Sequence, residues 1–417
     1  METQVTEVQY ILNSFLFLVC GALVMFMAAG FAMLEAGMVR SRSVATIILK
    51  NISLYSVACL MFYLTGYNLM YDGVDGGWIG SLSIWSADDS AALNGDYSAG
   101  YAATSDWFFQ MVFVATTASI ISGTLAERVR IMPFLLFVVV LTGFIYPITG
   151  AWEWGAGWLD AKGFSDFAGS TLVHSVGGWC ALTGAILLGP RAGRFNADGT
   201  PNQIQPSAIT LVGLGTFVLW LGWFGFNGGS QLALGTAGDV IAISTIFANT
   251  NTAAAAGVVS AMLASHLRFG KIDVYQMLNG ALAGLVAITA EPLMPELWQA
   301  ALIGVLAGIV LVLFEPLLVK FKIDDVVGAI PVHLLCGILG TLIVPWTNPD
   351  ATFSVQLIGV LAIGGFCLVT SAIVWSILKF TMGLRLSDEH QQSGADMSEL
   401  GIHAYPYFSD RREQIRM

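Results

Sequence analysis

The stretch DFAGSTLVHSVGG at 166–178 places His174 inside a long apolar run. A second apolar run carries VHLLCG at 332–337, so His333 stands in a matching position. Ionisable groups are expensive in a lipid phase and usually face a pathway or the interior of a helix bundle. A single such histidine is more often a structural group, but two at matched positions indicate a functional pair. Two neutral imidazoles in contact can share one proton, because one nitrogen donates while the other accepts.

The composition of the chain around these histidines indicates a membrane protein. Of 417 residues, 56% are hydrophobic and 11% are charged, against roughly a quarter charged in soluble domains. Because about 20 apolar residues span a bilayer, we predict an all-α polytopic membrane protein with eleven transmembrane helices. The helices are expected near 11–34, 46–70, 107–126, 131–150, 167–189, 207–230, 240–264, 273–290, 299–319, 326–345 and 355–380.

The basic residues predict the orientation, since Lys and Arg are retained on the cytoplasmic side. With these helices, sixteen of the seventeen basic residues sort to alternate loops, Lys50 among them, and Lys162 is the exception. The N-terminus is therefore expected outside and the C-terminus inside the cell (inner) membrane. The first ten residues carry no Lys or Arg, so the first run should remain a membrane helix rather than act as a signal peptide. We expect a transmembrane domain at 1–380 and a cytoplasmic tail at 381–417.

The matched histidines also suggest internal symmetry. Helices one to five and six to ten would have opposite topology, as in transporters built from inverted repeats, and the eleventh helix would be peripheral. The net charge of -11 excludes a nucleic-acid partner. No third metal-ligating group and no nucleophile beside a base accompany the histidines, so we predict no metal, no cofactor and no enzyme activity.

Aromatic residues form a second group of candidates. In WFGFNGGS at 223–230, the spacing puts Trp223, Phe226 and Ser230 on one helix face, and Phe109 and Phe113 are also four residues apart. Aromatic stripes are usually packing, but the glycines here would let helices approach around a narrow lumen.

Two further residues have alternative interpretations. Trp154 suits an interfacial aromatic belt or a cation site on its indole face. Asp166 lies eight residues before His174 and suits either an N-cap or the stabilisation of a cation. The residues alone leave both alternatives open.

These residues lie in a sequence that resembles the ammonium transporter family, the Amt/Mep/Rh group, in its bacterial Amt branch. The similarity runs over nearly the whole chain, through FAMLEAGMVRSRSV, FFQMVFVATTASIISGTLAERVR, DFAGSTLVHSVGG, WFGFNGGS, LNGALAGLVAITA, DDVVGAIPVH and GLRLSDEHQQSGADMSELGIHAYP. The resemblance implies a homotrimer in the lipid bilayer with one pore per protomer. It also implies transport of ammonium or ammonia, with methylammonium as a surrogate substrate.

The resemblance assigns roles to individual residues. The outer substrate-binding site would consist of Trp154, Ser230, Phe113 and Asp166. The phenyl gate would be Phe113 and Phe226, and the pore would be lined by His174, His333, Trp223, Tyr146, Thr289 and Phe109. A regulatory tail, expected to dock on a neighbouring protomer and to respond to a PII-type protein, would use Arg385, Asp396, Gly401 and Tyr405.

One departure and one alternative function accompany the resemblance. Many relatives have an acid five positions before the second histidine and a glycine two before it, where this chain has Gly328 and Pro331. A different packing of the tenth helix is therefore expected. The alternative function is an ammonium sensor that signals through the tail, although a tail of this length is too short for a kinase or cyclase domain.

Overall fold

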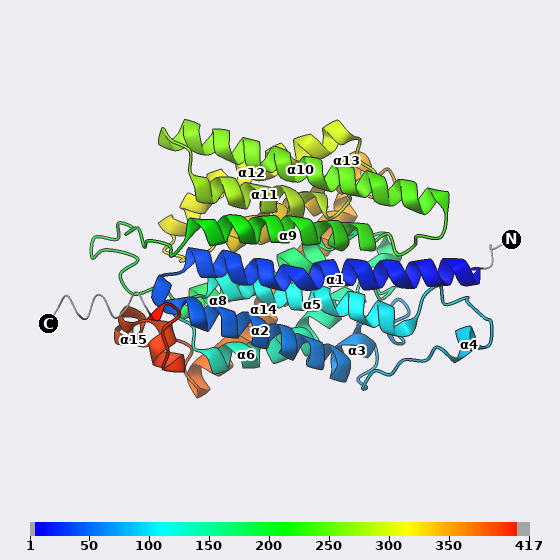
Figure 1. Cartoon of the computed structure of the whole chain (residues 1–417), viewed down its shortest axis with the longest axis horizontal. Coiled ribbons are helices and arrows are strands. Elements are labelled where there is room, and N and C mark those ends of the chain that lie inside the picture. Colours follow the sequence, from blue (N-terminus) through cyan, green and yellow to red (C-terminus); the bar gives the residue numbers. More distant parts are fainter. Residues whose placement is uncertain (1–4, 407–417) are drawn as a thin grey trace.

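A computed structural model describes residues 5–406 and shows a bundle of helices and loops with two isolated β-bridges in that range (Figure 1). Ten of the described helices are long and apolar enough to cross a membrane. The helix α11 (Val274–Ile288) is equally apolar but has only 15 residues. The prediction of an all-α membrane protein is confirmed at this level.

The membrane helices of the first half begin and end close to the predicted positions. They are α1 (Glu7–Met38), α2 (Val44–Met61) continued by η2 (Phe62–Gly66) and α3 (Tyr67–Tyr71), α5 (Ala103–Thr124), α6 (Ile131–Val140) continued by η3 (Leu141–Ile145) and α7 (Tyr146–Ala151), and η5 (Ser170–Ser175) continued by α8 (Val176–Leu188).

The membrane helices of the second half also lie close to the predicted positions. Its helices are α9 (Ile209–Gly229), α10 (Ala237–Phe269), α11, α12 (Leu297–Lys320), η6 (Ile330–Leu335) continued by α13 (Cys336–Thr347), and α14 (Phe353–Thr381). Short elements in loops and tail are η1 (Ser41–Ser43), α4 (Ser90–Leu93), η4 (Asp160–Lys162), α15 (Asp388–Ser393) and η7 (Asp396–Leu400).

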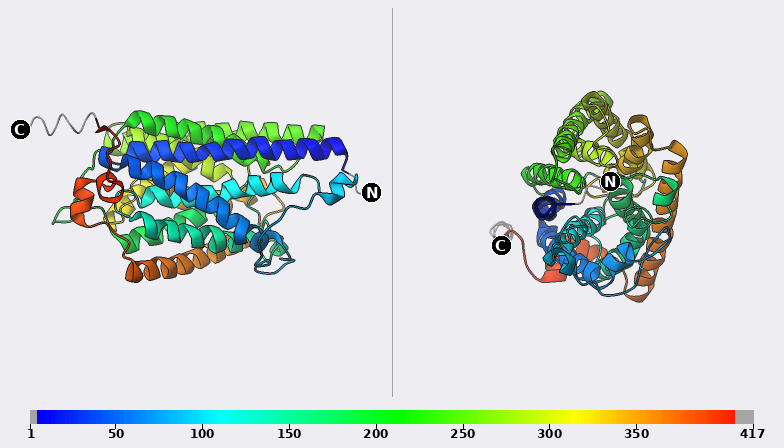
Figure 2. Two further views of the ribbon diagram at one scale, coloured as in Figure 1. Left: turned by 60° about the horizontal axis from the view of Figure 1, so that its bottom comes forward. Right: turned by 90° about the vertical axis from the view of Figure 1, so that its right-hand side faces the viewer.

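Small residues let the helices at the centre of the bundle lie close together. α1 lies against α9, and a Cβ added to Gly215 of α9 would stand 2.5 Å from the backbone nitrogen of Leu34 in α1. α1 also packs on α5, so these three helices run side by side along the long axis of the molecule (Figures 1 and 2). Glycine at such contacts is typical of membrane helix bundles, where packing takes the place of a hydrophobic driving force.

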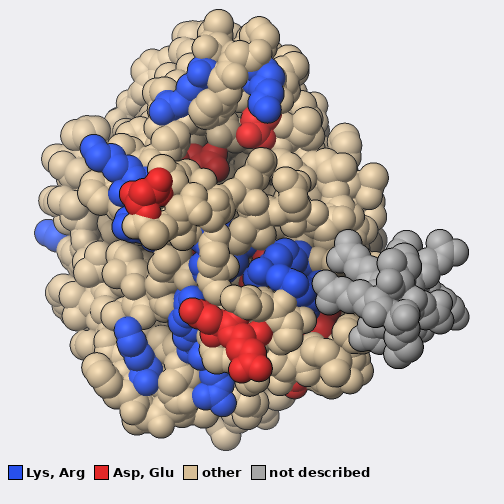
Figure 3. Space-filling view, turned by 90° about the vertical axis from the view of Figure 1, so that its left-hand side faces the viewer, with Lys and Arg blue, Asp and Glu red and all other residues tan. Residues whose placement is uncertain are grey.

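The two ends of the described chain lie at opposite ends of the bundle (Figure 1). The end that carries the C-terminal tail shows groups of Lys and Arg on its surface (Figure 3). We call it the cytoplasmic end, following the rule that basic residues are retained there.

One basic residue lies elsewhere than predicted. Lys50 was assigned to the cytoplasmic loop after the first helix, but it belongs to α2 and is 2% exposed. Its ammonium group donates to the Ser122 carbonyl at 2.6 Å and lies 3.7 Å from a carboxylate oxygen of Glu35. A neighbouring counter-charge therefore keeps this lysine inside the bundle, which loop assignment by charge alone overlooks.

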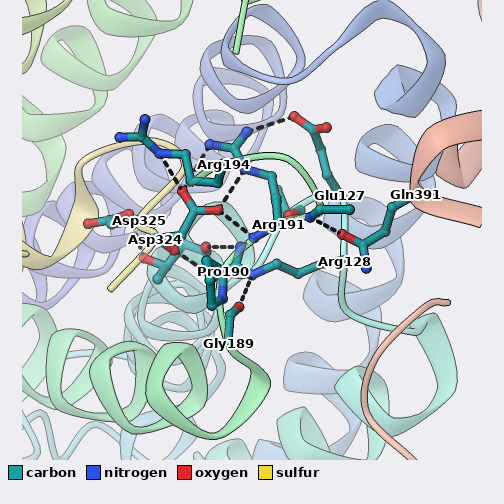
Figure 4. A network of polar contacts seen from close by, with 12 residues as sticks. Glu127, Arg128, Gly189, Pro190, Arg191, Arg194, Asp324, Asp325 and Gln391 are labelled. Atoms are coloured by element: carbon teal, nitrogen blue, oxygen red, sulfur yellow. Dashed lines mark hydrogen bonds and ion pairs between the residues drawn. The ribbon is translucent and has the colours of Figure 1, made fainter. Parts of the chain in front are cut away.

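A network of charged groups ties the loops together at the cytoplasmic end (Figure 4). The Asp324 carboxylate accepts hydrogen bonds from the Arg191 guanidinium at 2.8 and 3.0 Å and from the Arg191 backbone at 2.9 Å. Arg191 also pairs with Glu127 at 2.9 Å, and Gln391 of the tail accepts from the Ala192 backbone at 2.9 Å. The network joins the end of α8, the start of η6 and the tail.

Candidate functional site

The two predicted histidines meet in the centre of the bundle. The Nδ1 atoms of His174 and His333 lie 3.2 Å apart, with the ring planes inclined by 24°. Both side chains are buried, at 0% and 3% exposure. The Nε2 atom of His174 is buried and has no hydrogen-bond partner in the described part of the chain. Since only one proton fits between the two Nδ1 atoms, one ring then offers an acceptor at Nε2 and the other a donor.

Each histidine lies in a six-residue π-helical turn, η5 or η6, at the start of its membrane helix. π-Helical turns are rare and are often found at functional sites. The turn η5 is held by Asp166, whose carboxylate accepts backbone N–H groups at 2.8 to 3.1 Å from each of residues 169 to 172. Asp166 is not the N-cap residue itself, which is Gly169, but its side chain caps the turn from three residues earlier. A direct role in cation stabilisation stays a prediction.

The second histidine turn is held by an acid in the equivalent place. Asp325 lies eight residues before His333, and its carboxylate accepts from the backbone of Gly328 at 3.2 Å and of Ile330 at 2.7 Å. Both segments spell D-x-x-G-x-x-x-V-H, at 166–174 and at 325–333. The match noted from the sequence begins at the valine before each histidine, so it did not include the aspartate and the glycine of this longer repeat.

The two repeated segments enter the bundle from opposite ends. Residues 167 and 168 donate backbone hydrogen bonds to the carbonyls of Ala290 and Thr289, just beyond the C-terminal end of α11. The carbonyl of Val327 accepts from the Asn279 side chain at 2.9 Å, near the N-terminal end of the same helix. The segments therefore run toward each other and meet at the histidines, as an inverted repeat requires.

Gly328 and Pro331 fit this arrangement. Gly328 has φ +77° and Gly169 has φ +104°, so both repeats use glycine in a left-handed conformation before the π-helical turn. Pro331 lies in the first turn of η6, where a missing N–H costs little. Helix ten thus keeps the histidine in place without an acid at position 328, because Asp325 supplies the cap.

Aromatic rings form a line that leads to the histidine pair. Phe113 and Phe226 stack with centroids 4.0 Å apart and an interplanar angle of 27°. The ring centroid of Phe226 lies 5.4 Å from that of His174, and Trp223 stacks on the same imidazole with centroids 4.9 Å apart. Trp154 meets the Phe113 ring edge to face, with the ring centroids 6.1 Å apart. The predicted gate residues are in contact and lie directly in front of the histidine.

The remaining predicted pore residues differ in their contacts with this line, and no ring contact or hydrogen bond joins the Tyr146 side chain to it within residues 5–406. Thr289 accepts the Trp223 indole N–H at 2.8 Å and so fixes the ring, and Phe109 packs against Phe113 at 4.9 Å. The Ser230 hydroxyl donates to the Phe226 carbonyl one turn earlier, at 2.9 Å. Tyr146 is buried and its hydroxyl has no hydrogen-bond partner within residues 5–406.

Trp154 and Asp166 are joined directly. The Trp154 indole N–H donates to the backbone carbonyl of Asp166 at 3.0 Å. This bond holds the indole edge-on to Phe113, while the Asp166 carboxylate faces the start of η5. One short segment therefore orients both an outer aromatic ring and a histidine turn.

The residues predicted in the tail pack on the chain itself. The Asp396 carboxylate accepts from the backbone of Ala45 and Thr46, at 3.0 and 2.7 Å, at the N-terminal end of α2. Arg385 donates to the Pro190 carbonyl at 2.6 Å, and Gly401 ends η7 with φ +69°. Tyr405 packs against the core. Docking on a neighbouring protomer stays a prediction, and residues 407–417 lie outside the described chain.

Two acids inside the bundle escaped the sequence analysis. Glu35, in the motif FAMLEAGMVRSRSV, is fully buried and faces Lys50. The Glu153 carboxylate accepts the Asp166 backbone N–H at 3.3 Å, and its other oxygen is buried without a hydrogen-bond partner among the residues that the structure describes. The sequence pattern had pointed only to Asp166, His174 and His333 among the ionisable groups inside the membrane. Within residues 5–406, no group of three His, Cys, Asp or Glu side chains could hold a metal ion.

A bundle of membrane-crossing helices around an aromatic line that ends at a buried imidazole pair belongs to the class of multi-pass transport proteins. Residues 15–405 match the profile of the Ammonium Transporter Family. The chain is 40% identical over 421 residues to ammonium transporter Amt2 of Archaeoglobus fulgidus, covering 94% of this chain and 87% of that protein. It is 41% identical over 405 residues to a putative ammonium transporter of Synechocystis, covering 96% and 90% of the two chains. The chain therefore belongs to the ammonium transporter family.

Solved structures agree with this fold. A structure titled as a sensor Amt protein superposes with a TM-score of 0.88 at 34% identity, covering 94% of this chain and 99% of that one. Mep2 of Candida albicans superposes with a TM-score of 0.80 at 24% identity and covers 94% and 90% of the two chains. The resemblance noted in the sequence is thus confirmed over nearly the whole chain.

Proposed function

We propose that this protein is an ammonium transporter of the cell (inner) membrane that binds ammonium at its outer aromatic site and passes ammonia along the histidine pair. The observation that carries the proposal is the contact of His174 with His333 behind the stacked rings of Phe113 and Phe226. The Nε2 atom of His174 is buried and has no partner among residues 5–406. Membership of the family and relatives named as ammonium transporters support the substrate.

The outer site would take ammonium from water. An indole face attracts a desolvating cation, an interaction worth about 2 kcal/mol. Trp154 presents its ring beside Phe113, and Ser230 lies one helical turn beyond Phe226. These three residues can replace part of the hydration shell of an ammonium ion, which then stands at the outer side of the phenyl gate.

The gate and the histidines would separate ammonium from potassium. The two ions have the same charge and similar size, so a ring of charge cannot distinguish them. Only ammonium carries a removable proton. Behind the stacked phenyl rings, an isolated charge would cost many kcal/mol in a space with few polar partners. Release of a proton and passage of neutral ammonia avoids this cost, and potassium has no such route.

The histidine pair would then handle the neutral nitrogen and the proton. Ammonia both donates and accepts hydrogen bonds, and the pair offers one acceptor and one donor at its Nε2 atoms. The shared Nδ1 contact allows a proton to move between the rings. We therefore propose net charge movement with each transported nitrogen, with Asp166 and the histidines as groups along the proton route.

The selectivity test uses reconstituted protein and electrical recording with ammonium or potassium pulses. We expect His174→Asp and His333→Glu to produce potassium currents that the parent protein lacks, because a fixed carboxylate admits a bare cation. His266→Asp, at an exposed position at the end of α10, is the matched control and should leave selectivity unchanged. Unchanged ammonium selectivity in both pore variants would count against the mechanism. Competition of methylammonium uptake by ammonium tests the substrate class, since carbon dioxide would make no use of Trp154.

A sensor is the second candidate, because one of the similar structures is titled as a sensor Amt protein. The tail contacts in residues 385–401 provide a route by which the state of the pore could reach the cytoplasmic surface. Measured uptake decides between the two functions: a sensor binds ammonium without bulk flux, whereas a transporter accumulates methylammonium across proteoliposome membranes.

The assembly belongs to the same proposal. We infer eleven crossings with α11 as the eighth, a homotrimer with one pore per protomer, and a regulatory tail open to a PII-type protein. Light scattering of the purified protein tests the trimer. Deleting residues 386–417 should alter flux or the coupling of protomers, and unchanged flux would discard the regulatory role.

A further inference from the structure

A small cavity lies on the cytoplasmic side of the histidine pair. It is lined by His333, by Phe31 and Glu35 of α1, by Ser119 of α5 and by Asn279 of α11. The space open to the centre of a water-sized sphere is about 10 Å³, which is close to what one water molecule requires. Ammonia and ammonium are of that size. The cavity therefore suits one small solute that has just passed, or is about to reach, the histidines.

Glu35, one of the residues that line this cavity, has a carboxylate oxygen with no well-formed hydrogen bond within residues 5–406. The Oε2 atom of Glu35 accepts the Ser122 hydroxyl at 2.7 Å and lies 3.7 Å from the Lys50 ammonium. The Oε1 atom is buried and accepts no well-formed hydrogen bond within the described chain, although the Asn51 side chain lies beside the carboxylate. A buried charged oxygen without a partner costs free energy, so its presence in a folded protein requires an explanation.

We propose that Oε1 of Glu35 binds an ammonium ion in this cavity, which makes it a second, cytoplasmic-side cation site of the passage. The proposal rests on the proposed function and adds a residue and a location to it. An ammonium N–H would donate a charge-assisted bond to Oε1. The Phe31 ring, 6.2 Å from the His333 ring, offers an apolar wall with a face for the cation.

Lys50 keeps Glu35 available for this role. The Lys50 ammonium donates a hydrogen bond to the Ser122 carbonyl, and this bond holds the ammonium near Oε2 of Glu35. The distance to Oε2 is that of an ion pair and is too long for a hydrogen bond. Lys50 thus balances the charge of Glu35 without occupying Oε1. Ammonia that leaves the histidines accepts the proton that has passed along the histidine pair, and Glu35 holds the ammonium ion that forms against return through the gate.

The test variant is the double substitution Glu35→Gln with Lys50→Met. Glu35→Gln alone would leave Lys50 buried without a counter-charge and could prevent folding, whereas loss of both charges of a buried pair is often tolerated. Glu315→Gln is the matched control, because Glu315 is also a largely buried carboxylate that accepts one side-chain bond, from Gln276, but lies outside the cavity.

Oriented proteoliposomes on a solid support give the ammonium concentration for half-maximal current from each face. We expect the double variant to raise this concentration about tenfold when ammonium is added at the cytoplasmic face, as the loss of one hydrogen bond to a charged group would do. The value for the outer face should stay within about twofold of the parent. Equal values for parent and double variant at the cytoplasmic face, or equal shifts at both faces, would overturn the site.

Equilibrium titration of the detergent-solubilised protein with ammonium chloride does not depend on transport. The parent and Glu315→Gln should bind one more ammonium per protomer than the double variant. Equal stoichiometry in all three overturns the cation site even if the parent transports. If the extra site is present but the parent shows no ammonium current or uptake, the site stands and the proposed transport function fails.

Discussion

Replacing Asp324 by asparagine should weaken the protein at the cytoplasmic junction of its two halves (Figure 4). Asp324 is 2% exposed and accepts three hydrogen bonds from Arg191, itself 7% exposed. Removing one charge of a buried pair costs about 3 to 5 kcal/mol, because the partner charge stays buried. We expect about 3 kcal/mol, at the lower end, because asparagine can still accept one bond and Glu127 continues to neutralise Arg191.

The measurement is the free energy of unfolding in mixed detergent micelles, followed by tryptophan fluorescence. Asp388→Asn is the matched control: its pair with Arg385 is 3.2 Å long, but the Asp388 side chain is 71% exposed, so the loss should be about 1 kcal/mol or less. A cost for Asp324→Asn no larger than for the control would refute the assignment of this pair as the junction.

The difference in unfolding free energy between the parent and Asp324→Asn should depend on pH in a defined direction. Burial alone would raise the pKa of Asp324, but the Arg191 charge and hydrogen bonds hold it well below its usual value. A carboxylate with a depressed pKa contributes stability above its unfolded pKa, which is about 3.9, and loses it as the pH falls toward the folded pKa. The gap between parent and variant should therefore be constant from about pH 8 to 5 and shrink only below about pH 4.

Three other substitutions test neighbouring parts of the structure. Gly169→Ala should destabilise the protein by about 1 kcal/mol or more, because Gly169 has φ +104° and an added Cβ would stand 2.5 Å from a side-chain atom. Gly365→Ala, inside α14 with open space around it, should be neutral or slightly stabilising in the same unfolding assay. Trp223→Phe removes the bond to Thr289 and should lower ammonium current while leaving the amount of folded protein unchanged, which size-exclusion chromatography checks. Asp396→Asn removes the negative charge from the N-terminal end of α2 and should make the tail more sensitive to limited proteolysis; equal cleavage rates would argue that the contact does not hold the tail.

The positions of the membrane helices could be predicted because hydropathy and charge act along the chain. The last membrane helix was expected at 355–380 and is found at Phe353–Thr381. The π-helical turns could not be predicted this way, because an i to i+5 hydrogen bond leaves no mark on the spacing of apolar residues. Lys50 was assigned to a loop because the rule for basic residues concerns loops. In the sequence, a lysine that pairs with Glu35 inside the bundle cannot be told from a lysine in a loop.

The histidine pair itself was predictable from matched positions, but its geometry was not. The 3.2 Å contact depends on two turns that start at opposite ends of α11, and the carboxylates that fix those turns act through backbone N–H groups. The repeat D-x-x-G-x-x-x-V-H contained this information. Its meaning becomes clear only when each glycine is known to be left-handed and each acid is known to face the following turn.

The equivalence of Asp166 and Asp325 separates two roles that a single variant would confuse. Both acids cap a histidine turn, but only Asp166 is joined to the outer ring of Trp154. If Asp166 acts only as a cap, Asp166→Asn and Asp325→Asn should reduce maximal ammonium current to a similar degree and leave the half-saturating concentration at the outer face unchanged. If Asp166 also stabilises the incoming cation, its variant alone should raise that concentration. Positioning of the histidines and recruitment of ammonium are therefore distinguishable, because the inverted repeat provides an acid with the first role and without the second.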